Sequence, residues 1–283
     1  MDIIPLATGF GASIAGFDIA NGGKPDEIAR LREAFDHHDL LIFRDCGTIP
    51  GPRHAEIAGW FGPIGANRDA GGNPWTTLDN EDQVGSAVLP FHCDIGYMRH
   101  PFEGLSLHPL ALPEGGTSTT FVSNAVGWDA LDSEIKTLLA RRTTCHAFRD
   151  AHIVDADWPP LVHWHPAMLP HPRSGRPLLF VTENHVTEIE GLDEAESAPL
   201  LARIFACLYA PERQYEHIWR PGDLLVWNNL AIQHARTRVA APSAGRRVMQ
   251  RVALGRHGFH DQVAALRAAT GFQDQDLSAP AGI

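Results

Sequence analysis

The stretch LPFHCDIGYMRH, residues 89–100, brings an imidazole and a carboxylate together at His92 and Asp94, on either side of Cys93. Residues two apart in a β-strand point to the same face. His92 and Asp94 would then form half of a metal site, with Cys93 packing on the opposite face. The pattern alone is weak: about one histidine in twenty has an Asp two positions later, and the chain has 16 histidines. A second example, HHD at residues 37–39, closes a predicted helix and is interpreted as a helix end and turn.

A third metal ligand would have to come from a distant part of the chain, and His234 is the candidate. It follows the apolar run DLLVWNN, which predicts a strand and a short turn, although His234 taken alone fits a structural histidine equally well. Two neutral imidazoles and one carboxylate form the facial set of non-haem Fe(II) oxygenases, which leaves coordination positions open for other ligands. Zn(II) or Mn(II) accepts the same set, so a cupin-type metal-dependent hydrolase or isomerase stays an alternative.

Three arginines, Arg246, Arg247 and Arg251, lie in the strand-like segment GRRVMQRVAL. Strand geometry puts Arg247 and Arg251 on one face and Arg246 on the other. The apolar neighbours favour burial of that shared face, and a buried guanidinium needs an anionic partner, such as a dicarboxylate ligand. Arg251 lies about 13 Å further along the strand and would need a second anion, either an acidic substrate or an internal Asp or Glu. The competing interpretation is a solvated edge strand with its charges outward.

The elements that would position these groups can be read from the hydrophobic periodicity. Apolar residues at helical spacing predict helices at residues 24–39, 52–62 and near 200–208. From about residue 83 onward, short strand-like runs alternate with turns. We therefore expect a mainly β fold, a sandwich or jelly roll with flanking α-helices. Without repeats or linker-like stretches, the sequence predicts a single domain over residues 1–283.

The composition limits the partners of this protein. A formal net charge of −11 disfavours binding to nucleic acid or to an anionic membrane. The four cysteines are far apart and form no CxxC pattern, which predicts reduced thiols. The start MDIIPLATGF lacks the features of a signal peptide, and no apolar run reaches the length of a membrane span. We expect a cytoplasmic protein that acts on a small molecule.

The motifs around these residues resemble the TauD/TfdA family, the taurine and 2,4-dichlorophenoxyacetate dioxygenases that depend on Fe(II) and 2-oxoglutarate. IIPLATGFGASIAGFDI is similar to the family's N-terminal segment, LIFRD to its first core strand and FHCDIGY to its WHTD-type metal-binding motif. LPEGGTSTTFVSNAVGWDAL resembles its Gly-Gly-x-Thr strand and following helix; HPRSGRPLLFV, WNNLAIQH and RRVMQR resemble further motifs. The resemblance runs nearly end to end and implies a double-stranded β-helix, a jelly-roll core.

The resemblance also implies roles for individual residues. The iron ligands would be His92, Asp94 and His234. Arg247 would bind the distal carboxylate of 2-oxoglutarate, and the hydroxyl of Thr119 would donate to the same group. Arg251 matches the arginine that contacts an acidic substrate in members that act on sulfonates or carboxylates.

The substrate pocket is where the sequence departs from the family. Asn67 replaces a histidine that binds sulfonate in the taurine enzyme, and the apolar Val88 replaces an asparagine. These two changes predict a substrate other than taurine. Phe148 matches a pocket aromatic. Three further residues are candidate pocket or core aromatics: Trp75, Phe91 and Tyr97.

The function implied is a dioxygenase that couples decarboxylation of 2-oxoglutarate to oxidation of a small, carboxylate-bearing substrate. Its cofactors would be Fe(II), 2-oxoglutarate as cosubstrate, and O2. Halogenating relatives lack the metal-binding carboxylate, so Asp94 favours hydroxylation. Family members commonly form homo-oligomers, and the same is expected here. Besides the hydrolase or isomerase, a non-catalytic sensor of iron and 2-oxoglutarate stays an alternative.

Overall fold

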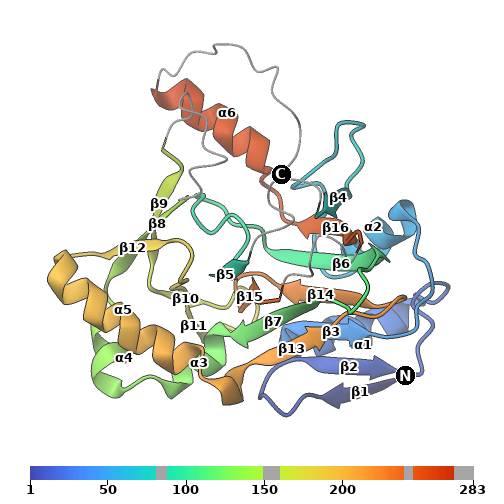
Figure 1. Ribbon diagram of the computed structural model, residues 1–283, viewed down its shortest axis with the longest axis horizontal. Helices are drawn as coiled ribbons and strands as arrows, with labels where there is room; N and C mark the ends of the chain where they lie inside the picture. The colour runs from blue at the N-terminus through green and yellow to red at the C-terminus, as the bar shows by residue number, and fades with distance from the viewer. Residues whose placement is uncertain (81–87, 149–159, 239–244, 271–283) are drawn as a thin grey trace.

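Two β-sheets face each other in the centre of the computed structural model, which describes residues 1–80, 88–148, 160–238 and 245–270 (Figure 1). The larger sheet has the order β1-β2-β3-β14-β6-β16-β4, formed by Asp2–Pro5, Ala12–Ala15, Leu40–Phe43, Leu224–Asn228, Gly104–Ala111, Val248–Leu254 and Thr76–Asp79. The smaller sheet has the order β13-β7-β15-β5, formed by Tyr215–Ile218, Ser118–Ser123, Ile232–Arg236 and Leu89–His92. Neighbouring strands are antiparallel except β2 and β3, which are parallel.

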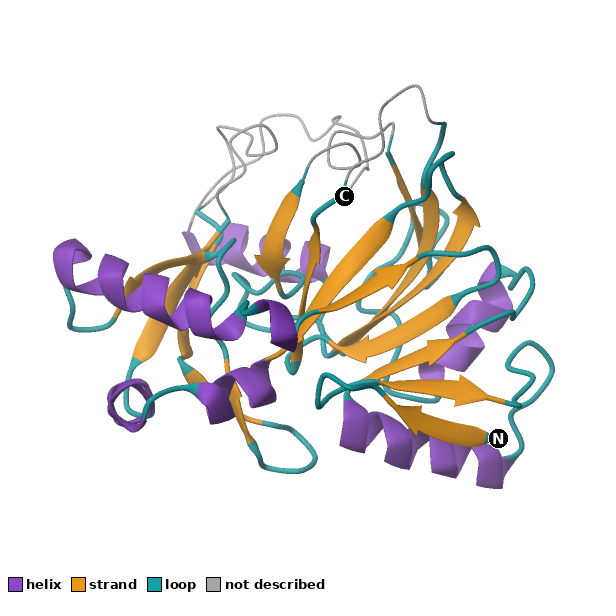
Figure 2. Cartoon of the chain, turned by 60° about the horizontal axis from the view of Figure 1, so that its bottom comes forward, coloured by secondary structure: helices purple, strands orange, loops and turns teal. Residues whose placement is uncertain are grey.

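Two smaller sheets and the helices complete the described part of the chain. One small sheet has the order β12-β8-β9 (Val186–Ile189, Thr143–Ala147 and Val162–Pro166), and β10 pairs with β11 (Met168–Pro170 and Pro177–Leu179). The α-helices are α1 Pro25–His38, α2 Gly51–Gly59, α3 Asn124–Ala130, α4 Ser133–Leu139, α5 Glu194–Leu208 and α6 Phe259–Thr270, with a 3-10 turn at Pro211–Arg213. Figure 2 shows α1 against the N-terminal strands of the larger sheet and α3, α4 and α5 at the opposite end of the molecule.

The central core lies between the two main sheets. Phe121 and Ile232 of the smaller sheet pack in one cluster with Leu225, Trp227 and Met249 of the larger sheet, and all five side chains are buried. Alternation along each strand places the next residues on the outer faces, where the helices cover them. The helices α1 and α2 cover the larger sheet, and α3 and α5 cover the smaller one.

This arrangement confirms the predicted fold class, a mainly β jelly roll with flanking helices. The helices expected at residues 24–39, 52–62 and 200–208 are present as α1, α2 and the C-terminal part of α5. No helix in the described ranges combines the length and the apolar character that crossing a membrane requires.

One local expectation was wrong. The strand β5 ends at His92, so Asp94 lies beyond it in a turn where Ile95 has a φ of 49°. Strand alternation therefore does not determine the direction of Asp94.

Candidate active site

Strand pairing brings two of the predicted metal ligands together. β5 and β15 are antiparallel neighbours, and His92 is the direct partner of His234. The Nε2 atoms of both imidazoles lie 3.3 Å from Oδ1 of Asp94. One ligand atom from each of the three residues falls within 4.8 Å of the others, a spacing that suits a single metal ion.

The third ligand, Asp94, is oriented by a contact across the sandwich. Asn229, directly after β14, accepts a hydrogen bond from the Asp94 backbone N–H at 2.9 Å and donates one to the Asp94 carbonyl at 3.0 Å. The same amide donates to the carbonyl of Phe102 at 3.0 Å. The backbone of Asp94 is therefore held by a side chain from another strand end.

The protonation states of the three groups suit a divalent cation. Nδ1 of His92 lies 2.8 Å from the Pro90 carbonyl and donates to it, so in the neutral imidazole the lone pair lies on Nε2, the atom that faces Asp94. Burial and the nearby His92 lower the pKa of His234, which favours its neutral form. Burial alone would raise the pKa of Asp94, but the imidazoles of His234 and His92 and the Arg251 guanidinium outweigh it and hold that pKa well below its ordinary value. Two imidazoles thus face one carboxylate.

The outer oxygen of Asp94 is occupied by Arg251. The Nη1 atom of Arg251 lies 3.1 Å from Oδ2, while Oδ1 faces the two imidazoles. Of the partners that the sequence left open for Arg251, the structure contains the internal carboxylate. With Oδ2 engaged, Asp94 presents a single oxygen to a metal.

The predicted anchors for 2-oxoglutarate are Arg247, directly before β16, and Thr119 on β7. Arg247 is 8% exposed, and no partner of its Nε atom is found in the described part of the chain. Burial, together with the charge of Arg236, lowers the pKa of Arg247 to about 10, so the side chain remains a cation at neutral pH. Arg246 faces outward, as predicted, and binds Asp79.

The hydroxyl of Thr119 is oriented by a tryptophan. Thr119 lies two residues before the core residue Phe121, on the same inner face of β7, and its Oγ1 accepts a hydrogen bond of 2.9 Å from Nε1 of Trp219. Its own hydroxyl proton is then available to a ligand. The neighbouring Ser118 and Thr120 bond instead to Glu216 and Thr237.

Aromatic side chains lie on one side of the three candidate ligands. The rings of Tyr97 and Phe148 are 4.9 Å apart, and the ring of His185 lies 5.1 Å from Tyr97 and 6.0 Å from His92. Asp94 adds to burial in raising the pKa of Tyr97, which stays a neutral phenol. Tyr97 and Phe148, two of the predicted pocket residues, therefore lie close to the metal-ligand group.

The other predicted pocket residues are not brought to this group. Phe91 points to the outer face of β5 and stacks on Tyr209 at 4.3 Å, because side chains alternate and its neighbour His92 points inward. Trp75 packs in the cluster under α1 and α2. Val88 is 60% exposed, and Asn67 is buried in the loop between α2 and β4 without a recorded contact to the three ligands.

Three residues near the site were missed by the sequence analysis: Asn229, Arg236 and His185. Arg236 follows His234 by two residues on β15 and is 8% exposed, so strand alternation could have identified it. His185 and Asn229 approach the site from other segments. No local pattern marks them.

The second histidine–aspartate pattern forms a different structure. Asp39 is fully buried in a left-handed conformation at the end of α1, and it binds His171 at 3.0 Å and also Arg176. Within the described residues, His92, Asp94 and His234 form the group of ligand atoms close enough for a metal, and Asp39 belongs to no such group. The interpretation of residues 37–39 as a helix end is confirmed.

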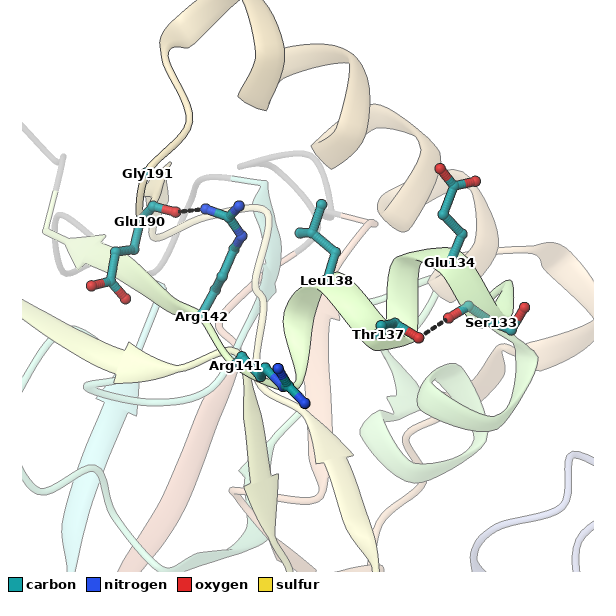
Figure 3. Close-up of a pocket in the computed structure, with 8 residues that line it drawn as sticks. All are labelled: Ser133, Glu134, Thr137, Leu138, Arg141, Arg142, Glu190 and Gly191. Atoms are coloured by element: carbon teal, nitrogen blue, oxygen red, sulfur yellow. Dashed lines mark hydrogen bonds between the residues drawn. The ribbon is translucent and has the colours of Figure 1, made fainter.

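A surface hollow lies elsewhere, between α4 and the loop after β12 (Figure 3). Its lining includes Glu134, Arg141, Arg142 and Glu190, and the Arg142 guanidinium donates to the Glu190 carbonyl. It contains none of the metal-ligand residues or the inward arginines, so it is not the candidate active site.

Comparisons with known proteins agree with this geometry. The profile of the family described as taurine catabolism dioxygenase TauD, TfdA family matches residues 2–253. An (S)-phenoxypropionate/alpha-ketoglutarate-dioxygenase of Sphingobium herbicidovorans is 29% identical, over 83% of this chain and 89% of the relative. An alpha-ketoglutarate-dependent 2,4-dichlorophenoxyacetate dioxygenase of Cupriavidus pinatubonensis is 25% identical, over 81% and 90%. A taurine dioxygenase structure from Burkholderia xenovorans shares the fold, with a TM-score of 0.77 at 22% identity over 89% of this chain and 90% of that one.

Proposed function

Because the chain belongs to the TauD/TfdA family and is an alpha-ketoglutarate-dependent dioxygenase, we propose that His92, Asp94 and His234 hold its iron. The observation that carries this proposal is the position of Asp94 Oδ1, 3.3 Å from the Nε2 atoms of both imidazoles. The donor set, two neutral imidazoles and one carboxylate, fits Fe(II). The three side chains are 12–14% exposed, which leaves access for further ligands. When bound, Fe(II) and 2-oxoglutarate supply the electrons that activate O2.

Arg247 and Thr119 would hold the distal carboxylate of 2-oxoglutarate. A buried guanidinium calls for an anionic partner, and Arg247 is 8% exposed with its Nε atom lacking a partner in the described residues. Trp219 fixes the Thr119 oxygen as an acceptor, which directs the hydroxyl proton away from the indole. A cation and a hydroxyl donor would strengthen the binding of the carboxylate and fix its orientation.

Arg251 would bind the acidic group of the substrate while it orients Asp94. Its Nη1 atom contacts Asp94, and its Nε atom has no partner in the described ranges, so one guanidinium can bind both carboxylates. Tyr97 and Phe148 would supply an apolar wall for the body of the substrate. Asn67, Val88 and Phe91 stay predictions as pocket residues, although the geometry favours Tyr97 and Phe148 over them.

The substrate class we propose is a small carboxylic acid with an aromatic or apolar body, oxidised by hydroxylation, and not taurine. The named substrates of the two relatives, phenoxypropionate and 2,4-dichlorophenoxyacetate, combine these features. The protein positions the acid through Arg251 and excludes water with its aromatic side chains. We also propose that the protein is a cytoplasmic homo-oligomer that binds neither nucleic acid nor membrane; light scattering of the purified chain tests the oligomeric part.

The experiment is a panel of aryloxyalkanoic acids, aliphatic acids and taurine, scored for succinate formed from 2-oxoglutarate in the presence of Fe(II) and O2. We expect an aryloxyalkanoic acid to raise succinate formation well above the background without substrate, and Asp94→Ala to remove that increase. Taurine as the best substrate would contradict the proposed class. Full activity of Asp94→Ala would contradict the metal assignment.

A further inference from the structure

We propose that Asn229 is the positioning residue that holds the Asp94 carboxylate in register with the two imidazoles, an inference that rests on the proposed metal site. Its side chain is fully buried and makes three hydrogen bonds: with the Asp94 N–H, the Asp94 carbonyl and the Phe102 carbonyl. Neither the resemblance nor the family match assigns it a role.

The two histidines need no such support, because the sheet already fixes them. His92 and His234 are direct partners in the pairing of β5 and β15. The strand β5 ends at His92, so backbone pairing does not extend to Asp94. Asp94 begins a turn that includes Ile95 at a φ of 49°, a conformation that few residues other than glycine adopt. The direction of its side chain depends on backbone angles that no strand determines.

Asn229 makes the two hydrogen bonds that a neighbouring strand would have made to the backbone of Asp94. A neighbouring strand accepts from one backbone N–H and donates to one carbonyl of its partner. The Asn229 amide does both to Asp94 through its Oδ1 and Nδ2 atoms, at 2.9 and 3.0 Å. A carboxylamide has the same donor and acceptor as a peptide group, and no charged side chain offers both.

The remaining bonds of Asn229 connect this turn to the rest of the sandwich. Its Nδ2 atom also donates to Phe102, shortly before β6, and its backbone N–H donates to the Glu103 carbonyl at 3.1 Å. Asn229 itself follows β14, and the short turn after it leads into β15, which carries His234. One residue thus fixes Asp94 relative to the strand of a second ligand. Groups that orient metal ligands typically contribute 10- to 100-fold in metal affinity or activity.

The chain offers a matched control in the preceding residue. Asn228 is also a buried asparagine at the end of β14, 7% exposed. Its Oδ1 atom accepts from the N–H groups of Leu230 and Ala231, and its Nδ2 atom lies 2.9 Å from Nε2 of His171. It makes no recorded contact with Asp94. Asn228→Ala therefore measures the general cost of removing a buried amide at this strand end.

The test compares Asn229→Ala with Asn228→Ala in the full chain, with Mn(II) as the probe metal, by calorimetric titration without O2. We expect Mn(II) affinity to fall tenfold or more in Asn229→Ala and less than threefold in Asn228→Ala, at comparable losses in Tm. The anaerobic absorption band of Fe(II) with 2-oxoglutarate should shift or weaken in the first variant alone. Equal affinities in the two variants would overturn the positioning role.

A second measurement uses the wild-type chain and does not depend on the folding of any variant. The Asp94 amide lies outside the strand pairing, yet its bond to Asn229 predicts slow hydrogen exchange. Exchange as fast as that of an exposed loop amide would overturn the inference even if Asn229→Ala failed to fold. Failure of the wild type to bind Mn(II) would instead remove the proposed metal site, and the role of Asn229 with it.

Discussion

The two histidine–aspartate patterns of this chain use the same chemical groups for opposite purposes. In each, one aspartate oxygen faces an imidazole and the other binds a guanidinium: His92, His234 and Arg251 surround Asp94, and His171 and Arg176 surround Asp39. Asp94 is 14% exposed at its side chain, whereas Asp39 is fully buried.

The difference lies in which imidazole nitrogen keeps its lone pair. His171 accepts hydrogen bonds at Nδ1 from the N–H groups of Arg173 and Ser174, so its Nε2 atom carries the proton and donates it to Asp39. His92 donates from Nδ1 to the Pro90 carbonyl, so the lone pair of its neutral form lies on Nε2, the atom that faces Asp94. In the first arrangement, the hydrogen bonds between His171 and Asp39 are satisfied without a bound ligand. In the second, the lone pair of neutral His92 and the Asp94 carboxylate face each other, and a cation, whether a proton or a metal ion, would satisfy both.

The residue types alone therefore do not distinguish the two patterns; at His92 and His171 the backbone partner of Nδ1 does. The following substitutions test this difference, in order of expected effect.

The largest effect should come from removing each aspartate. Asp94→Ala deletes a metal ligand, and Mn(II) affinity should fall more than about 100-fold, beyond the range for groups that only orient a ligand. Asp39→Ala should leave Mn(II) affinity within about threefold. It should lower the free energy of unfolding by roughly 2–4 kcal/mol, because the buried His171 and the partly exposed Arg176 lose their carboxylate partner. Calorimetric titration and urea unfolding measure the two quantities. A similar loss of Mn(II) affinity in both variants would erase the distinction between the two patterns.

The affinity for 2-oxoglutarate should depend on the inward-facing Arg247 and not on its outward-facing neighbour Arg246. Arg247→Ala would leave a desolvated carboxylate unpaired, which typically costs about 2–5 kcal/mol, or roughly 30-fold to several thousand-fold in affinity. Arg246→Ala changes a side chain that is 57% exposed. It should alter the affinity for 2-oxoglutarate less than about threefold. Titration of 2-oxoglutarate into anaerobic Fe(II)-loaded protein, followed by its visible band, provides the comparison. Unchanged affinity in Arg247→Ala would indicate that another cation, such as Arg236, holds the carboxylate.

The arginine partners of the two aspartates should also differ. Arg251→Ala should reduce succinate formation that depends on an acidic substrate by about tenfold or more, since a buried charge pair is lost. Arg176→Ala should lower Tm and leave the activity of the folded protein unchanged. Measuring both Tm and substrate-dependent succinate in each variant checks this. If Arg251→Ala and the wild type turned over the acid equally well, and its neutral analogue equally well, a role of Arg251 in substrate binding would be contradicted.

The smallest effect concerns an imidazole that has no carboxylate partner. His54 is fully buried between Gln250 and Ser106, and burial lowers its pKa to about 3. An unfolded histidine titrates near 6.5, so the stabilisation is complete above about pH 6.5 and is lost as the pH falls toward 3. At pH 5 the loss is about 2 kcal/mol. The free energy of unfolding between pH 7.5 and 5 should therefore decrease less steeply in His54→Gln than in the wild type; parallel profiles would show that His54 does not titrate on unfolding.

The sequence predicted the parts of this molecule that depend on local periodicity or strand alternation. The helix α1 and the inward face of Arg247 and Arg251 follow from spacing alone. The apolar run before His234 marked it as a candidate, and the TauD/TfdA resemblance supported His234 and pointed to Thr119. The direction of Asp94 was predicted for the wrong reason: its strand ends at His92, and a side chain from another segment orients it. Phe91 was a candidate for the pocket or the core, and strand alternation turns it to the outer face of β5.

Other features could not be read from the sequence because the determining contact is distant. The strands β8 and β9 have the sequences TTCHA and VHWHP, in which buried histidines occupy positions where apolar residues would give a recognisable alternation. His185 reaches His92 from a segment whose own pattern resembles a turn. Tertiary contacts override local propensity at such positions.

The pairing of His92 with His234 links completion of the proposed metal site to completion of the fold. The two residues are separated by half of the chain, and contacts between such distant segments form late because loop closure must precede them. A chain interrupted before β15 would contain only two of the three ligands. Since the complete set exists only in the native state, Mn(II) or Fe(II) should raise Tm in proportion to the logarithm of its concentration above its Kd. Under the proposed assignment, metal loading would follow folding, and thermal stability would report how much of the protein carries its metal.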